Sequence, residues 1–121
     1  MRQLLAVFLL FAGLSALGAD TATSLKGYLL DVACHDRLKP KGHLNLSAAL
    51  HSRSCLEAPF CTRSGFGVLT DDQHFIKFDD DGNAKVKKFI AGFNRETDIK
   101  IIVTGTVAGD KMTVSKIELQ Q

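Results

Sequence analysis

The sequence has almost no excess charge of either sign. Its 121 residues include 15 lysines and arginines against 13 aspartates and glutamates, which gives a net charge of +2 at pH 7. Proteins that bind nucleic acid or anionic lipid usually carry a clear excess of basic residues. The composition therefore provides no general attraction for such polyanions, and we expect no nucleic-acid partner.

Long apolar runs are also missing. The longest, residues 4–17, is interrupted by a glycine and a serine and is shorter than the roughly 20 apolar residues that span a bilayer. Arg2 precedes this run and two small residues follow it, which is the pattern of a cleaved secretory signal. We therefore predict a signal peptide over residues 1–19 and a single domain over residues 20–121. The mature protein is expected to be periplasmic or secreted, without a stable membrane anchor.

Several catalytic signatures are missing as well. The chain has no C-x-x-C pair, no C-x-x-C-H and no glycine-rich loop with phosphate-binding spacing. These absences argue against thioredoxin-type redox chemistry, covalent haem attachment and nucleotide chemistry. No pair of carboxylates stands out for acid–base catalysis. We therefore expect a binding or structural protein and no enzyme.

The sequence does contain three cysteines, Cys34, Cys55 and Cys61, downstream of the predicted signal. In an oxidising compartment, an odd number of thiols leaves at least one sulfur outside any simple intramolecular pairing. That sulfur is a metal ligand, a reactive group or a link to a second chain. The cysteines are therefore the residues most informative about function.

The apolar pattern predicts five strands and two helices. Alternating segments rich in strand-forming residues place the strands at residues 25–33, 65–70, 73–78, 99–107 and 112–119. Helical spacing predicts one helix over residues 45–57, which Pro59 ends. A second helix follows Asn83 as its cap, with apolar residues at helical spacing from Val86 onward.

The order is strand, helix, two strands, helix, two strands, with short connections. This order suits a mainly β fold of the α+β class: a small OB-like five-stranded antiparallel barrel, or a bent sheet, with two helices. A flat α+β sandwich is the alternative. The apolar phase slips between Val114 and Ile117, which predicts either a β-bulge in the last strand or burial of that strand on both faces.

The spacing of His51 and Cys55 favours a metal site. In a helix over residues 45–57 these side chains are four residues apart and project from one face. An imidazole nitrogen and a thiolate can then reach one ion about 2.0–2.3 Å away. Cys61, just past the helix end, and Cys34, at the end of the first strand, complete a Cys3His set. Such a set suits zinc or copper.

Two other interpretations of the same residues stay open. In one, two cysteines form a disulfide that staples the domain, the third is buried or links two chains, and no metal is bound. In the other, one cysteine is an accessible thiol of low pKa in a redox protein. Asp31, three residues before Cys34, either orients a ligating histidine or caps the exit of its strand.

Several segments of the chain together resemble a group of small exported bacterial proteins of unassigned function. The segments that carry the resemblance are residues 27–34, 51–61, 64–70 and 103–107. The resemblance implies an exported location, and the last segment implies an OB-like terminal hairpin. It implies no ligand and no reaction. The sequence alone thus favours a small exported binding or structural domain with a cysteine and histidine cluster.

Overall fold

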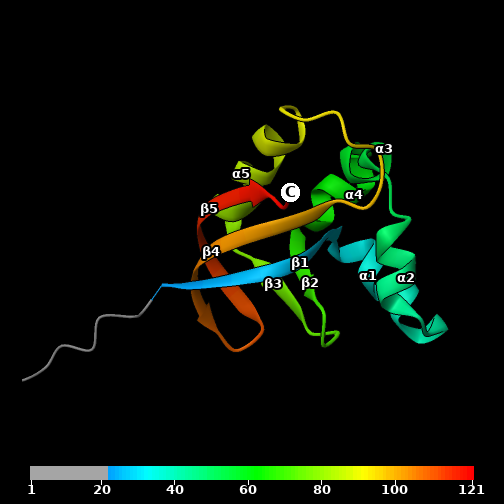
Figure 1. Cartoon of the computed structure of the whole chain (residues 1–121), viewed down its shortest axis with the longest axis horizontal. Coiled ribbons are helices and arrows are strands. Elements are labelled where there is room, and N and C mark those ends of the chain that lie inside the picture. The colour runs from blue at the N-terminus through cyan, green and yellow to red at the C-terminus, as the bar shows by residue number, and fades with distance from the viewer. Residues whose placement is uncertain (1–21) are drawn as a thin grey trace, which may run out of the picture.

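Five β-strands close into a small barrel in the computed structural model, which describes residues 22–121. The strands are β1 (Thr23–Asp31), β2 (Phe66–Thr70), β3 (Phe75–Phe78), β4 (Lys100–Ala108) and β5 (Lys111–Leu119). Their order around the barrel is β1-β2-β3-β5-β4, and β4 pairs again with β1 (Figure 1). The predicted mainly β, α+β fold with five strands is confirmed. The pairing is mixed, however, because β3 and β5 run parallel while the other neighbours are antiparallel.

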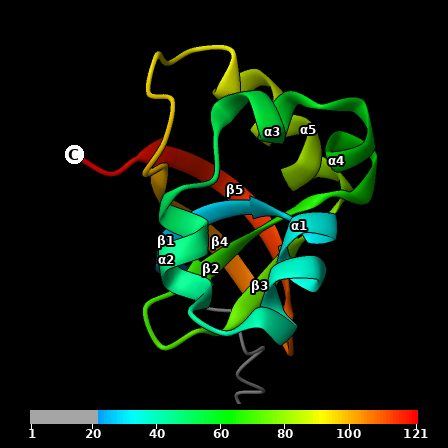
Figure 2. The same cartoon turned by 90° about the vertical axis from the view of Figure 1, so that its right-hand side faces the viewer.

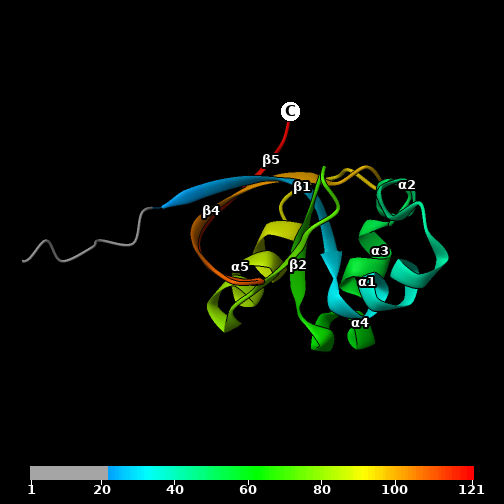
Figure 3. The same ribbon diagram turned by 90° about the horizontal axis from the view of Figure 1, so that it is seen from below.

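The helices form two groups along the chain. Those between β1 and β2 are α1 (Val32–Leu38), the 3-10 helix η1 (Lys39–Lys41), α2 (Leu44–Ala49), α3 (Arg53–Glu57) and α4 (Pro59–Ser64). A longer helix, α5 (Asp80–Ile90), connects β3 to β4. The sequence predicted two helices, whereas residues 22–121 contain five α-helices and one 3-10 helix. Figures 1 and 3 show α1 to α4 gathered on one side of the barrel, and in Figure 2 α1 and α2 lie in front of the strands.

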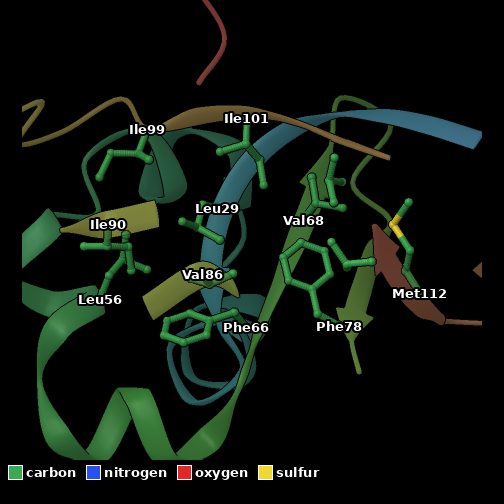
Figure 4. Close-up of a cluster of buried hydrophobic side chains, with 12 residues drawn as sticks. Leu29, Leu56, Phe66, Val68, Phe78, Val86, Ile90, Ile99, Ile101 and Met112 are labelled. Carbon is green, nitrogen blue, oxygen red and sulfur yellow. The ribbon is translucent and has the colours of Figure 1, made fainter. Parts of the chain in front are cut away.

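The C-terminal end of β1, residues 29–31, is buried on both faces because helices cover its outer side. Leu29 belongs to the barrel core with Val68, Ile101 and Met112 (Figure 4). Its neighbour Leu30 points to the opposite face, as alternation along a strand requires, and belongs to a second apolar cluster that includes Leu44 and Ala48 of α2. The helical group is therefore anchored on the outer face of β1 and β2.

The predicted β-bulge in the last strand is confirmed. Thr104 of β4 lies opposite Lys116, but the next residue, Gly105, lies opposite Val114, so Ser115 is the extra residue. The Ser115 hydroxyl donates a hydrogen bond to the Thr104 carbonyl, 3.0 Å away. A β-carbon at Gly105 would overlap the Thr113 carbonyl, so the bulge requires glycine there.

The cap of α5 differs from the prediction. Asp79 is the N-cap, and its carboxylate accepts a hydrogen bond from the Gly82 amide at 2.9 Å. The predicted cap, Asn83, lies within the helix, and its side-chain oxygen accepts a hydrogen bond from the Phe66 amide at 2.9 Å. Asn83 thereby fixes the start of β2, where the chain leaves α4.

Two adjacent isoleucines of β4 test the assignment of inner and outer faces. Ile101 is fully buried in the barrel core, whereas Ile102 points outward and is only partly buried. We expect Ile101→Ala to lower the free energy of unfolding by about 2–5 kcal/mol, because it removes buried methylene groups and leaves a cavity. Ile102→Ala is the matched control and should cost less than half as much. Urea denaturation measures both, and equal losses would contradict the barrel register.

Candidate metal centre

Three cysteine side chains converge from three different helices. Cys34 lies on α1, Cys55 on α3 and Cys61 on α4, and their sulfur atoms lie within 4.8 Å of one another. We call these residues the cysteine cluster. Cys34 and Cys61 are buried, with 2% and 7% of their surface exposed, and Cys55 is partly exposed. The sulfur-to-sulfur distances of 4.1 to 4.5 Å are far longer than the roughly 2.05 Å of a disulfide bond.

Each cysteine is the third residue of its helix. Asp31 caps α1, and its carboxylate accepts a hydrogen bond from the Cys34 amide at 2.9 Å. Ser52 caps α3, and its hydroxyl accepts one from the Cys55 amide at 3.1 Å. In α4, Pro59 is the first residue, where its missing N–H costs nothing. Local capping therefore sets the rotation of each helix and places its cysteine in the first turn.

Hydrogen bonds fix α1 against the end of α4. The Ala33 amide donates to the Ser64 hydroxyl at 3.1 Å, and that hydroxyl also donates to the Cys61 carbonyl at 2.6 Å. The Val32 amide donates to the Gly65 carbonyl at 2.9 Å. These contacts hold the backbones of Cys34 and Cys61 side by side.

Arg53 fixes the helix that carries Cys55. Its amide donates to the Glu96 carbonyl at 2.8 Å, and its guanidinium donates to the Phe93 carbonyl at 3.0 Å. The same guanidinium lies 3.3 Å from the Glu96 carboxylate. Because Phe93 and Glu96 belong to the segment between α5 and β4, the position of α3 is set from outside the helical group.

A buried aspartate and histidine lie beside the cysteine cluster. One oxygen of Asp31 lies 2.9 Å from Nε2 of His51, and the other caps α1. Asp31 is fully buried and His51 is 8% exposed. Asp31, His51 and Cys34 form a second group whose possible ligand atoms lie within 4.8 Å of one another. Cys34 is therefore shared between the cysteine cluster and the Asp31–His51 pair.

The surroundings of Asp31 shift its own pKa, and its negative charge shifts the pKa of the nearby thiols. Burial alone would raise the pKa of Asp31, but the hydrogen bonds from His51 and the Cys34 amide outweigh it and hold this pKa below its usual value. Burial raises the pKa of Cys34 and of Cys61, and the negative charge of Asp31 raises each further. Without a cation, these two sulfurs are therefore protonated at neutral pH. A bound cation would displace their protons.

A guanidinium also contacts the cysteine cluster. Nη2 of Arg37 donates a hydrogen bond to the sulfur of Cys34 at 3.3 Å. Arg37 and Cys34 are three residues apart on α1, so both face the same side of that helix. This contact brings a permanent positive charge to the edge of the cluster.

The structure brings the predicted ligands together in a different way from the one expected. A single helix over residues 45–57 is wrong, because α2 ends at Ala49 and Ser52 caps a new helix, α3. His51 lies in the link between them, so it shares no helix face with Cys55. It groups with Cys34 and Asp31 instead. The disulfide of the alternative interpretation is not seen, since all three cysteines in residues 22–121 are free.

Both interpretations of Asp31 fit the structure, because one oxygen caps a helix start and the other contacts a histidine. Sequence reasoning missed Arg37. The segments Asp31-x-x-Cys34 and Ser52-x-x-Cys55 each place a capping residue three positions before a cysteine, which is a readable sign of a helix start. That sign would have located the break before α3.

Comparison with protein-family profiles, curated proteins and solved structures gave no match. The resemblance to small exported bacterial proteins therefore stays a prediction. The predicted signal peptide lies outside the described residues, so export stays a prediction too. Within residues 22–121, no helix is long and apolar enough to cross a membrane.

The lowered pKa of Asp31 makes stability depend on pH. A carboxylate whose pKa is lower in the folded state stabilises the fold above its unfolded pKa, and this contribution is lost as pH falls through the folded pKa. We expect Asp31→Asn to lower the free energy of unfolding at pH 7 by about 1.5–3 kcal/mol, the range for a hydrogen bond to a charged group. At acid pH below the folded pKa the loss should shrink, because the wild-type carboxyl is then also neutral.

Urea denaturation of the metal-free protein at neutral and acid pH measures this difference. Asp110→Asn, at the exposed turn between β4 and β5, is the matched control and should change stability little at either pH. A loss for Asp31→Asn that is the same at both pH values would contradict the assignment of a stabilising charge.

Proposed function

We propose that this chain is a small exported metal-binding domain in which Cys34, Cys55 and Cys61 hold one thiophilic cation as thiolates. The observation that carries the proposal is the convergence of three unbonded sulfurs, from three helices, within 4.8 Å of one another. Soft thiolate ligands select zinc or copper(I) over harder cations. The domain would store or transfer this ion, or use it to hold its helices together.

The sulfur distances support a shared ion. Thiolates bound to zinc at about 2.3 Å lie about 3.8–4.0 Å from one another in tetrahedral or trigonal geometry. The observed 4.1 to 4.5 Å exceeds this range by only a few tenths of an ångström. Small rotations of the three side chains would therefore bring each sulfur to binding distance without moving the helices.

Charge balance favours zinc over copper(I). Three thiolates and the Asp31 carboxylate carry four negative charges, and within residues 22–121 only Arg37 donates a hydrogen bond to one of the sulfurs from a permanently charged group. A divalent cation neutralises one more of these charges than a monovalent cation does. Because the site is largely buried, each uncompensated charge is costly.

His51 is the candidate for the fourth ligand. It shares a group of possible ligand atoms with Cys34, and its hydrogen bond to Asp31 resembles the carboxylate–histidine pairs that orient metal ligands. In this arrangement Asp31 holds Nε2 of His51, the metal would bind Nδ1, and Asp31 acts on the metal through the imidazole ring. Four protein ligands would close the site to substrate, which suits a structural or transfer role and argues against hydrolysis.

Metal titration tests the proposal directly. We expect the mature protein, purified under reducing conditions, to bind about one equivalent of zinc and to compete with chelators. Cobalt(II) in place of zinc should give thiolate-to-metal charge-transfer absorption. Serine substitution of any one of the three cysteines should weaken zinc binding by at least about tenfold, because each removes one ligand.

Thiol counting distinguishes the proposed metal site from a disulfide-stapled domain. Denatured, metal-free wild-type protein should show three free thiols, whereas a disulfide-stapled domain would show one. Binding of less than about a tenth of an equivalent of zinc or copper(I) by protein with three free thiols would overturn the proposal.

Substitutions of two histidines test the role of His51. His51→Gln should weaken zinc binding by about 10- to 100-fold, the range for loss of a ligand or of its orienting partner. His74→Gln is the matched control, since the His74 side chain is 76% exposed and belongs to neither group of possible ligand atoms. Competition with a chelator of known affinity measures both variants. Equal affinities would show that the three cysteines bind zinc without His51.

A further inference from the structure

The three residues of the cysteine cluster differ in their exposure to solvent. Cys34 and Cys61 are 2% and 7% exposed, while Cys55 is partly exposed on the short helix α3. Thiol–disulfide exchange requires that the attacking sulfur reach a sulfur of the incoming disulfide. An oxidant from solvent therefore meets Cys55 before it meets the other two.

The two buried sulfurs are placed to complete such a reaction. Both lie within 4.8 Å of the Cys55 sulfur. A movement of about 2 Å brings either sulfur to the roughly 2.05 Å of a disulfide. The helices that carry the cysteines are only five to seven residues long, so such a movement involves short segments.

We propose that the site releases its metal on oxidation, with Cys55 as the sulfur that is attacked first and Cys34 or Cys61 as the sulfur that closes the internal disulfide. This inference rests on the proposed metal binding. The oxidant is a small-molecule or protein disulfide. The cation would be held as long as the three cysteines stay reduced and would be delivered when a disulfide oxidises two of them.

The exchange balances in two steps. The Cys55 thiolate attacks the oxidant RSSR, forms a mixed disulfide and expels one RS⁻. The thiolate of Cys34 or Cys61 then attacks Cys55, forms the internal disulfide and expels the second RS⁻. The protein loses two electrons and RSSR gains them. The metal loses two of its three sulfur ligands and leaves, and the thiolate of the third cysteine takes up a proton from water and becomes a free thiol.

Oxidised glutathione and a zinc indicator test the release. Addition of oxidised glutathione to the zinc-loaded protein should release one zinc per internal disulfide formed and leave one free thiol, and a thiol reductant should restore binding. Oxidation that leaves the zinc bound, or no oxidation under conditions that oxidise a small dithiol, would overturn the redox inference alone. Failure of the protein to bind zinc at all would instead overturn the proposed function.

Serine variants of the metal-free protein test the order of attack without any need for metal binding. Cys34→Ser and Cys61→Ser keep Cys55 with one neighbour, so both should form a disulfide with oxidised glutathione at nearly the same rate as the wild type. Cys55→Ser keeps only the two buried sulfurs and should react at least about tenfold more slowly. Mass spectrometry should find the first glutathione adduct on Cys55. Equal rates for the three variants, each folded by circular dichroism, would overturn the assignment.

Discussion

The carboxylate of Asp31 joins the barrel to the helices that carry the cysteines. Asp31 is the last residue of β1 and is fully buried. One oxygen starts α1 through the Cys34 amide, and the other holds His51, which lies between α2 and α3. A single side chain thus ends a strand, begins a helix and fixes a link twenty residues further along the chain. Because a buried carboxylate is costly unless it is fully hydrogen-bonded, these three functions depend on one another.

Much of the barrel was predictable from the sequence because strand patterns are local. Alternation located all five strands, and the phase slip near Val114 located the bulge at Ser115. The parallel pairing of β3 with β5 was not predictable, since it depends on how the whole chain closes. The first helix was misjudged for a local reason. The apolar spacing of residues 45–57 is compatible with one helix, but Ser52 bonds to the Cys55 amide and starts a new one.

The candidate site was predictable in its residues but not in its arrangement. The scarcity of cysteine made Cys34, Cys55 and Cys61 stand out. The predicted uninterrupted helix over residues 45–57 would have placed His51 and Cys55 on one face, which the structure does not show. In the structure, proximity of the sulfurs comes from contacts between segments far apart in the chain, such as Ala33 with Ser64 and Arg53 with Glu96. No periodicity in the sequence reports such contacts. The grouping of His51 with Asp31 likewise follows from the way α2 packs on β1.

The register between β1 and β2 has a consequence for how the molecule is assembled. Asp31 pairs with Phe66, and the Val32 amide bonds to the Gly65 carbonyl, so the two strands form a hairpin whose connection is the entire helical segment. The connection enters and leaves at one rung of the ladder. The length and sequence of this connection can therefore change without altering the strand order. A different insert could be placed between Asp31 and Phe66 of the same barrel.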